Sequence, residues 1–509
     1  MVWCILLVLT SILSYFHLPL CTGEDSITSG KKITSNETIT SAGGNFALGF
    51  FSPGNSTFTY LGIWYNTIPN QTVIWVANRE SPLRKNSSAI LTLGEDGNLV
   101  LLDGKREVVW SSSVALSDSG VKSTIGVLLD TGNLELRHGG GESTVLWESF
   151  EHPTDTLMPG MKLRLNRTTG QGSLVTSWAD DDDPSPGIFS AGIDSEGRAQ
   201  MFIWKQHHPY WRSNVYAGSS SSTVFAKSLG FSLYLTYSLE GDEIYITYGG
   251  SESLKKIRLV LTPSGQVELL LWQQSSSTWL VLWQVPETKC EFYAHCGPFG
   301  SCEQNGSHSL CKCLTGFEPN VPKEWVTGNW SGGCVRKKAL KCDKGDGFLK
   351  LERMKLPDGS ISLANMSVSE CEFQCRSNCS CTAYAYANVS GEPTVNCLNW
   401  FGDLMDLTHN YITGQDLYVH LHVSEIGGRK NNSSNKARIL IAVAAALSIG
   451  LLLIIVFGYV LWFKRLRRQE RTFGNIVGVS TRSVTTTTSS QAAGSCSNND
   501  MTISTPRPR

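Results

Sequence analysis

The residues of this chain that are best suited to covalent chemistry are its cysteines. Twelve of the 15 cysteines lie between Cys290 and Cys397, and the other three are Cys4, Cys21 and Cys496. Thiols at this density either pair as disulfides or hold zinc. Which of the two chemistries applies depends on whether the segment folds in an oxidising or a reducing compartment.

Two apolar runs bear on the compartment. Residues 2–20 are followed by small residues around Cys21, which predicts a secretory signal peptide over residues 1–23; an uncleaved signal anchor is the alternative. Residues 439–463 carry no charge, and as a helix they would span about 37 Å against a hydrocarbon core of about 30 Å. The second run therefore predicts one tilted transmembrane helix.

Charge and glycosylation motifs predict the orientation of this helix. Four basic residues follow the run closely, namely Lys464, Arg465, Arg467 and Arg468, and such flanks stay on the cytoplasmic side. All N-x-[ST] sequons precede the run. Their asparagines are Asn36, Asn55, Asn70, Asn86, Asn166, Asn305, Asn329, Asn365, Asn378, Asn388, Asn431 and Asn432. The prediction is a single-pass type I plasma-membrane glycoprotein with its N-terminus outside.

An extracellular location favours disulfides over zinc, although Cys-x-Cys pairs could serve as partial zinc ligands. The cysteines divide into two sets of six: Cys290, Cys296, Cys302, Cys311, Cys313 and Cys334, then Cys342, Cys371, Cys375, Cys379, Cys381 and Cys397. Each set allows fifteen pairings, so the connectivity stays open.

The spacing of the first set resembles an EGF-like module, with "CKCLTGF" as its core. No acidic lead-in precedes Cys290, so the calcium-binding variety is not expected, and the module is interpreted as a spacer. The second set, with "ECEFQCRSNCSC", resembles a PAN/apple domain. A short helix beginning near Ser369 would place Cys371, Cys375 and Cys379 along one face, where disulfides could staple it to a small sheet.

The N-terminal 150 residues contain an internal repeat. "GGNFALGFF", "EDGNLVLLD" and "DTGNLELRH" each place a Gly-Asn turn before an alternating apolar strand, and a second strand ending in tryptophan follows. The asparagines are Asn45, Asn98 and Asn133, and the tryptophans are Trp64, Trp110 and Trp147. Strand, turn and strand repeated three times predict three small sheets about a pseudo-threefold axis, with these tryptophans buried centrally.

This pattern, with "VIWVANRESPL", "SFEHPTDTLMPGMKL" and "CEFYAHCGPFGSC", resembles plant G-type (bulb-type) lectin S-receptor-like serine/threonine kinases of the S-locus glycoprotein type. The resemblance implies a mainly β, multidomain ectodomain. Together with the two apolar runs and the Thr/Ser-rich C-terminal segment, it divides the chain into a signal peptide (1–23), bulb-lectin β-prism (24–150), β-rich S-locus glycoprotein domain (151–285), EGF-like module (286–335), PAN/apple domain (342–423), juxtamembrane linker (424–438), transmembrane helix (439–463) and disordered tail (464–509). It also implies cell-surface recognition, including recognition of pollen.

The mannose motif of this lectin family is Q-x-D-x-N-x-V-x-Y. In the repeat that matches it best, its positions hold Gly94, Asp96, Asn98, Val100 and Leu102, so two hydrogen-bonding side chains are lost. A ligand hydroxyl left unpaired costs about 1–3 kcal/mol, which could erase a weak affinity. If carbohydrate binds here, the expected residues are Asp96, Asn98 and Val100. The alternative, which the residues favour, is that the Gly-Asn turns only hold the hairpins.

Other polar clusters have structural interpretations. The acidic run at residues 180–183 could hold calcium but is better explained as a solvated turn, and His207-His208 has no companion ligands. Trp272, Trp279 and Trp283 lie in alternating stretches typical of sheet packing, with a protein-partner surface as the alternative. No metal site or cofactor is predicted. The formal net charge of −1 implies no nucleic-acid partner.

A protein kinase needs a Gly-rich loop, a strand lysine, a catalytic aspartate and a DFG motif. Residues 464–509 contain none of these, so this chain is expected not to be an enzyme. Three interpretations follow. The first is a recognition protein, a co-receptor or decoy that binds an extracellular protein or glycan and pairs with itself or with full-length receptor kinases. The second is a truncated form or an incomplete gene model of such a kinase, and the third is a structural glycoprotein without a specific ligand.

Overall fold

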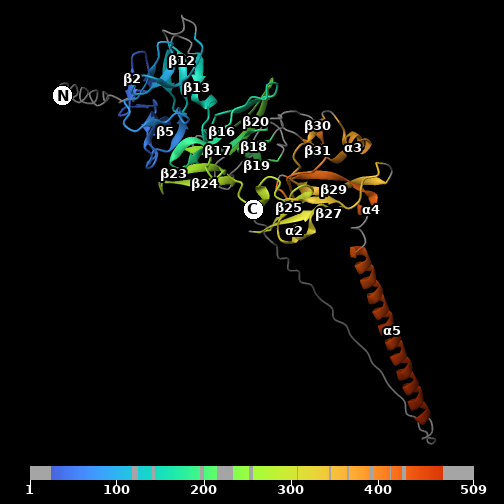
Figure 1. Cartoon of the computed structure of the whole chain (residues 1–509). Helices are drawn as coiled ribbons and strands as arrows, with labels where there is room; N and C mark the ends of the chain where they lie inside the picture. The colour runs from blue at the N-terminus through green and yellow to red at the C-terminus, as the bar shows by residue number, and fades with distance from the viewer. Residues whose placement is uncertain are drawn as a thin grey trace, which may run out of the picture. The chain divides into compact units, whose positions relative to one another are not determined.

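The structure is a computed structural model. It describes residues 24–116, 124–139, 144–194, 200–214, 233–250, 256–305, 308–342, 345–363, 366–388, 395–412, 414–426 and 432–473. The predicted signal peptide and most of the predicted tail lie outside these residues. The described chain is mainly β, as predicted, and forms two units, Met1–Gly428 and Arg429–Arg509 (Figure 1).

The N-terminal strands form three small antiparallel sheets, as the repeat predicts. Their strand orders are β3-β4-β5-β6 with β7 beside β5, then β10-β9-β8-β2, then β1-β11-β12-β13. The bounds are β1 Ser26–Ile27, β2 Lys32–Thr34, β3 Thr38–Thr40, β4 Phe46–Phe51, β5 Phe58–Tyr65, β6 Val73–Val76, β7 Leu83–Arg84, β8 Ile90–Leu93, β9 Leu99–Leu102, β10 Val108–Ser111, β11 Thr124–Leu128, β12 Leu134–His138 and β13 Val145–Glu148.

The Gly-Asn turns explain why these strands begin where they do. Gly44, Gly97 and Gly132 have φ of 72°, 77° and 87°, a region that residues with a Cβ seldom adopt. Each glycine N–H donates to the carbonyl three residues earlier, at 2.7, 3.0 and 3.0 Å. The turn chemistry predicted from the sequence is therefore present in all three repeats.

Three tryptophans do meet between the sheets, but one predicted member was wrong. Trp75, Trp110 and Trp147 pack edge to face, with ring centroids 5.6 to 6.0 Å apart. Trp64 instead packs in a separate cluster with Phe51 and other residues on the opposite face of its sheet. Side chains alternate along a strand, and on β5 the neighbours of Trp64, Ile63 and Tyr65, already face the common core.

Three more antiparallel sheets follow in the middle of the chain. Their orders are β14-β22-β23-β24, β15-β21-β20 and β16-β17-β18-β19. The bounds are β14 Thr156–Leu157, β15 Leu163–Asn166, β16 Val175–Asp180, β17 Asp183–Ile193, β18 Met201–Lys205, β19 His208–Arg212, β20 Leu233–Glu240, β21 Glu243–Gly250, β22 Ile257–Leu261, β23 Val267–Gln273 and β24 Thr278–Val285. A short 3-10 turn, η2 (Ser149–Glu151), precedes them.

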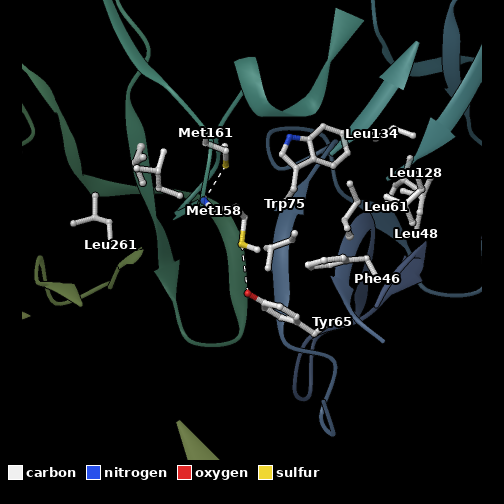
Figure 2. Packing of buried hydrophobic residues seen from close by; sticks show 14 of the residues in the cluster. Phe46, Leu48, Leu61, Tyr65, Trp75, Leu128, Leu134, Met158, Met161 and Leu261 are labelled. Atoms are coloured by element: carbon white, nitrogen blue, oxygen red, sulfur yellow. Dashed lines mark hydrogen bonds between the residues drawn. The ribbon is translucent and has the colours of Figure 1, made fainter. Parts of the chain in front are cut away.

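One hydrophobic cluster runs from the N-terminal sheets into the middle sheets. Figure 2 shows its crossing point, where the Tyr65 hydroxyl lies 3.6 Å from the Met158 sulfur and Leu261 lies beyond. Trp272 and Trp279 pack against this cluster and against each other, with centroids 5.5 Å apart. The described contacts of these tryptophans are those of sheet packing.

The cysteine-rich segment forms three further sheets with orders β26-β25-β33, β27-β28 and β29-β34-β31-β32-β30. Their bounds are β25 Gly300–Asn305, β26 His308–Cys313, β27 Phe317–Pro319, β28 Cys334–Arg336, β29 Asp346–Met354, β30 Ile361–Leu363, β31 Cys381–Asn388, β32 Val395–Phe401, β33 Leu407–Thr408 and β34 Gln415–His422. The helical elements here are η5 Lys289–Glu291, α2 Pro322–Val326, α3 Val368–Ser377 and α4 Val423–Ile426. Strand β25 of the first cysteine set pairs in parallel with β33 of the second.

Helix α3 is the helix that the cysteine spacing predicts. Ser367 caps it, and Ser367 and Glu370 form a reciprocal capping box. Cys371 and Cys375 are fully buried on the helix, but Cys379 lies past its end because Asn378 already has extended backbone angles. The predicted alignment of three cysteines along the helix was therefore wrong for the third.

The second unit contains one long helix, α5, at Asn432–Phe473. Its stretch Leu440–Leu466 has a mean hydropathy of 3.0, and by length and composition it could cross a membrane. The apolar run predicted at 439–463 lies almost wholly within this stretch.

Candidate functional site

The amide of Asn98 in the best-matching lectin repeat is fully engaged inside the protein. Its Nδ2 donates to Asp96 Oδ2 at 2.9 Å and to the Val114 carbonyl at 3.1 Å. Its Oδ1 accepts from the Ser112 hydroxyl and the Val114 N–H, both at 2.8 Å. Asn98 is only 3% exposed, and Val100 is also buried, whereas Asp96 is exposed. The amide therefore ties β9 to the chain after β10.

The third repeat uses its asparagine in the same way. Asn133 Nδ2 donates to Glu148 Oε2 at 2.7 Å and to Glu135 Oε1 at 3.2 Å. Its Oδ1 accepts from the Ser149 hydroxyl and the Phe150 N–H, both at 3.1 Å. These partners correspond to those of Asn98. In both repeats the asparagine connects the start of one strand to the chain that follows the next strand.

In the other two repeats, the positions of the mannose motif are occupied by residues that bond to one another or to neighbouring groups. Glu135, which replaces the motif valine, is buried and bonds to the guanidinium of Arg137, which replaces the motif tyrosine. In the first repeat, the Ser41 hydroxyl and the Gly43 N–H donate to Asp130 at 2.7 and 2.8 Å. Neither repeat presents the neutral amide, carboxylate and phenol of the mannose motif.

All twelve cysteines of the two sets lie within disulfide distance of a partner. The pairs are Cys290–Cys302, Cys296–Cys311, Cys313–Cys334, Cys342–Cys379, Cys371–Cys397 and Cys375–Cys381. Each pair stays within its own set, as the division into two modules predicts. Buried disulfides thus take the place of apolar side chains in much of the core of these small modules.

One group in the described residues has the geometry of metal ligands. His295, Cys302 and Cys311 have ligand atoms within 4.8 Å of one another. Zinc binds thiolates, and both sulfurs are in disulfides, so the group does not fit a metal. Burial and the nearby Lys289 lower the pKa of His295, whose ring packs edge to face against Trp330.

Most sequons of the described residues stand at the surface. Exposed asparagines are Asn36, Asn55, Asn70, Asn86, Asn329 and Asn378, and Asn166 is half-buried. Asn365 and Asn431 lie outside the described residues, as do the side chains of Asn305, Asn388 and Asn432. Attachment of glycans at these positions stays a prediction.

The acidic run and the two adjacent histidines lie at hairpin turns or at the strand ends beside them. Asp180 ends β16 and Asp183 begins β17, and the two are paired across a tight hairpin. Asp180 Oδ1 accepts from the Asp182 N–H at 2.9 Å, while Asp183 accepts from the Ser185 N–H at 2.9 Å. His207 lies in the turn before β19, and His208 begins that strand.

A buried ionic cluster was missed by sequence reasoning. Arg212 Nε lies 2.9 Å and Lys355 Nζ 2.8 Å from Asp406 Oδ2, and all three side chains are at most 3% exposed. Arg212 also donates to the Leu356 carbonyl at 2.6 Å. Burial lowers the pKa of Lys355 despite the adjacent carboxylate. The partners are far apart in sequence, and no local pattern marks them.

The motif "VANRE" also connects distant segments, because its arginine forms hydrogen bonds from the N-terminal sheets to the middle sheets. Buried Arg79 donates to the carbonyls of Pro184, Thr176 and Ser177 at 2.8, 3.0 and 2.7 Å. Asn78 accepts from the Leu61 N–H at 2.8 Å and donates to the Ser81 carbonyl at 3.0 Å. Asn78 and Arg79 are thus used inside the protein, whereas Glu80 of the same motif is exposed.

Three families match the chain. A D-mannose binding lectin family matches residues 72–179, the S-locus glycoprotein domain matches residues 211–321, and a PAN-like domain matches residues 342–407. The Gastrodia elata mannose-binding lectin structure covers 25% of the chain at 19% identity with a TM-score of 0.19, too low to support an argument.

Curated relatives from Arabidopsis thaliana match most of the chain. "Receptor-like serine/threonine-protein kinase SD1-8" is 37% identical over 445 residues, covering 86% of this chain and 51% of the relative. "G-type lectin S-receptor-like serine/threonine-protein kinase RKS1" is 37% identical over 440 residues, covering 84% and 52%. The chain spans about half the length of these relatives, and no kinase domain is found in it. Over the part of those proteins that it spans, the chain is a homologue of the plant G-type lectin S-receptor-like kinases, with their lectin, S-locus glycoprotein and PAN-like domains.

Proposed function

We propose that the chain is a single-pass cell-surface glycoprotein whose N-terminal domains recognise an extracellular ligand. The observation that carries the proposal is an asymmetry about the apolar part of α5: all sequons and all paired cysteines precede it, and a basic cluster follows it. Disulfides and N-glycans form in the secretory pathway, and basic flanks remain cytoplasmic. The ligand is an extracellular protein or glycan, with pollen components among the candidates.

Sugar binding at the best-matching lectin repeat is the weaker part of the proposal. Three residues of the mannose motif are kept in this repeat. Of these, Asp96 is exposed, whereas Asn98 and Val100 are buried. A ligand would have to replace the internal bonds of Asn98, and each buried group left unpaired costs about 1–3 kcal/mol. Recognition of a protein surface by the ectodomain therefore has more support than mannose binding at this repeat.

Pairing with a partner is the second part of the proposal. We propose that the chain pairs with itself or with full-length receptor kinases through its cysteine-rich domains, as a co-receptor or decoy. The alternative is that the chain is part of a longer receptor serine/threonine kinase, and the observation favouring it is that the curated relatives are about twice as long as the matched region.

Sequencing of the native transcript across the codons for residues 463–509 separates these two proposals. A transcript that stops after Arg509 supports the co-receptor or decoy, and full-length kinases should then co-precipitate with the tagged chain from membranes. A transcript that continues into a Gly-rich loop and a catalytic aspartate assigns the function to a receptor kinase. Absence of any saturable partner would favour a structural glycoprotein.

A further inference from the structure

A pocket of about 300 Å³ opens in the middle domain, beside the sheet β16-β17-β18-β19. It is lined by strands β15, β17 and β18 together with the segment that precedes β16. Its size is at the lower end for ligand sites, which hold about 300–1,000 Å³. We propose that this pocket binds one pyranose ring of a neutral sugar, independently of the lectin repeats.

A glycine in β17 leaves room for two of the side chains that line the pocket. A Cβ at Gly192 would lie 2.5 Å from Leu174 Cδ2 and 3.7 Å from Trp204 Cζ3. The missing side chain lets Leu174 and Trp204 approach each other above β17. Ser190, two residues earlier, is paired across the strands with Trp204, so its hydroxyl stands beside the indole.

Trp204 supplies an aromatic plate in a fixed orientation. Its ring stacks on Phe202, with centroids 5.3 Å apart and an interplanar angle of 13°. Phe202 is buried, whereas Trp204 is half-buried and borders the pocket. A pyranose has apolar faces made of C–H groups, which an aromatic ring can cover at little entropic cost because its orientation is already set.

Hydrogen-bonding side chains without a permanent charge lie near this indole. Gln206 and His207 are exposed on the turn after β18, and the described residues provide no hydrogen bond to either side chain. The backbone at Gln206 is fixed, because its N–H donates to the Ile188 carbonyl at 2.6 Å and its φ is 58°. Amide, imidazole and hydroxyl groups can each pair with a sugar hydroxyl.

The charge of the pocket argues against an anionic ligand. Arg164 at its edge is already paired, with its guanidinium 3.1 Å from Glu243 and 3.6 Å from Glu151. Among the lining residues, His207 is the one other group that can carry charge. A phosphate or carboxylate would therefore find no free permanent cation, whereas a neutral polyol requires none.

Ligand-observed saturation-transfer NMR tests the proposal on the full chain in nanodiscs. The N-glycans are removed first, so that the protein's own sugars give no signal. The probes are the methyl pyranosides of glucose, galactose and mannose. At least one should receive saturation, and Trp204→Leu or Gln206→Ala should weaken its binding at least tenfold.

Three further variants distinguish binding in this pocket from binding elsewhere on the chain. Gln71→Ala is a matched control, because Gln71 is also exposed with a positive φ of 42°, and it should bind normally. Trp204→Phe keeps an aromatic plate and should retain part of the binding if the fold is intact, as thermal unfolding would verify. Asp96→Ala alters the lectin repeat and should leave the pocket unaffected.

Three outcomes overturn the proposal. The first is that none of the three sugars receives saturation. The second is that Trp204→Leu, folded as well as the native protein, binds as tightly. The third is that Asp96→Ala abolishes binding while both pocket variants keep it, which would place sugar recognition at the lectin repeat instead.

Discussion

At the residue scale, the polar side chains that most resemble ligand-binding groups are used inside the protein. Asn98 and Asn133 each bond to backbone and side-chain groups of the segment that follows the neighbouring strand, and Arg79 bonds to three carbonyls. A Gly-Asn pair reveals the turn, because only local backbone angles are involved. It does not reveal Ser112 or Ser149, whose proximity depends on strand pairing, so the burial of the asparagines could not be predicted.

We expect Asn98→Ala to lower the free energy of unfolding by about 2 kcal/mol or more, because it leaves buried partners such as the Val114 N–H unpaired. The matched change Asn45→Ala should cost less than about 1 kcal/mol, since that amide makes a single long bond of 3.4 Å to Asp130. Thermal unfolding of the two variants measures the difference. Equal losses of unfolding free energy in the two variants would contradict the stabilising role assigned to Asn98.

The pH dependence of stability should include a contribution from His420. Its Nδ1 lies 3.0 Å from the Cys381 carbonyl and its ring stacks on Phe348, with centroids 4.7 Å apart. Burial lowers the pKa of His420, so the folded chain binds fewer protons than the unfolded chain. Stability should therefore be fully present above about pH 6.5 and fall as the pH is lowered toward the folded pKa.

Substitution of His420 by a neutral amide tests whether this histidine makes stability fall at lower pH. His420→Gln should flatten the fall in unfolding temperature between about pH 7 and 5, whereas His409→Gln, at an exposed histidine, should leave it unchanged. Because the pKa of His295 is lowered too, part of the slope should persist in His420→Gln. A slope as steep as that of the native chain would contradict the role of His420.

At the element scale, sequence patterns predicted which elements form better than which faces they present. The repeat predicted three sheets and the cysteine spacing predicted α3, since turn residues, capping residues and periodicity are local signals. The choice of Trp75 over Trp64 for the centre follows from the side-chain alternation of β5, where the sequence "IWY" is apolar on both faces. The position of Cys379 outside α3 likewise depends on where the helix ends.

The disulfide pairing makes a testable prediction about how helix α3 is attached to its sheet. Non-reducing peptide mapping should recover the links Cys371–Cys397 and Cys375–Cys381, which fasten the helix to β32 and β31. The double change Cys371→Ser with Cys397→Ser should cost about 2–5 kcal/mol or prevent secretion. Recovery of Cys371 linked to Cys375 would contradict this arrangement.

At the scale of the whole molecule, buried charges connect segments that the sequence presents as separate modules. Arg212 belongs to the middle sheets, and its partners Lys355 and Asp406 belong to the cysteine-rich segment. Parallel pairing of β25 with β33 joins the two cysteine sets in one sheet. The order of the modules stays a prediction from the sequence, and these connections could not be predicted, because long-range contacts leave no local pattern.

Removal of the shared carboxylate should destabilise several segments together. Asp406→Asn leaves two buried cations uncompensated, which typically costs about 3–5 kcal/mol. Asp416→Asn is the control, since solvent screens the exposed pair of Asp416 with Lys350 and its loss should change stability little. Thermal unfolding and limited proteolysis of both variants compare the losses. Similar behaviour of the two would show that the buried cluster does not hold the segments together.

In the proposed orientation, the lectin, S-locus glycoprotein and PAN-like domains face the outside of the cell. Labelling of intact cells with a membrane-impermeant biotin reagent, followed by N-glycosidase treatment of the labelled protein, tests it most directly. We expect the chain to be labelled and its mass to fall on deglycosylation by an amount equal to several glycans. A chain that is labelled only after the cells are made permeable, with no change in mass, would contradict the proposed orientation and the function that depends on it.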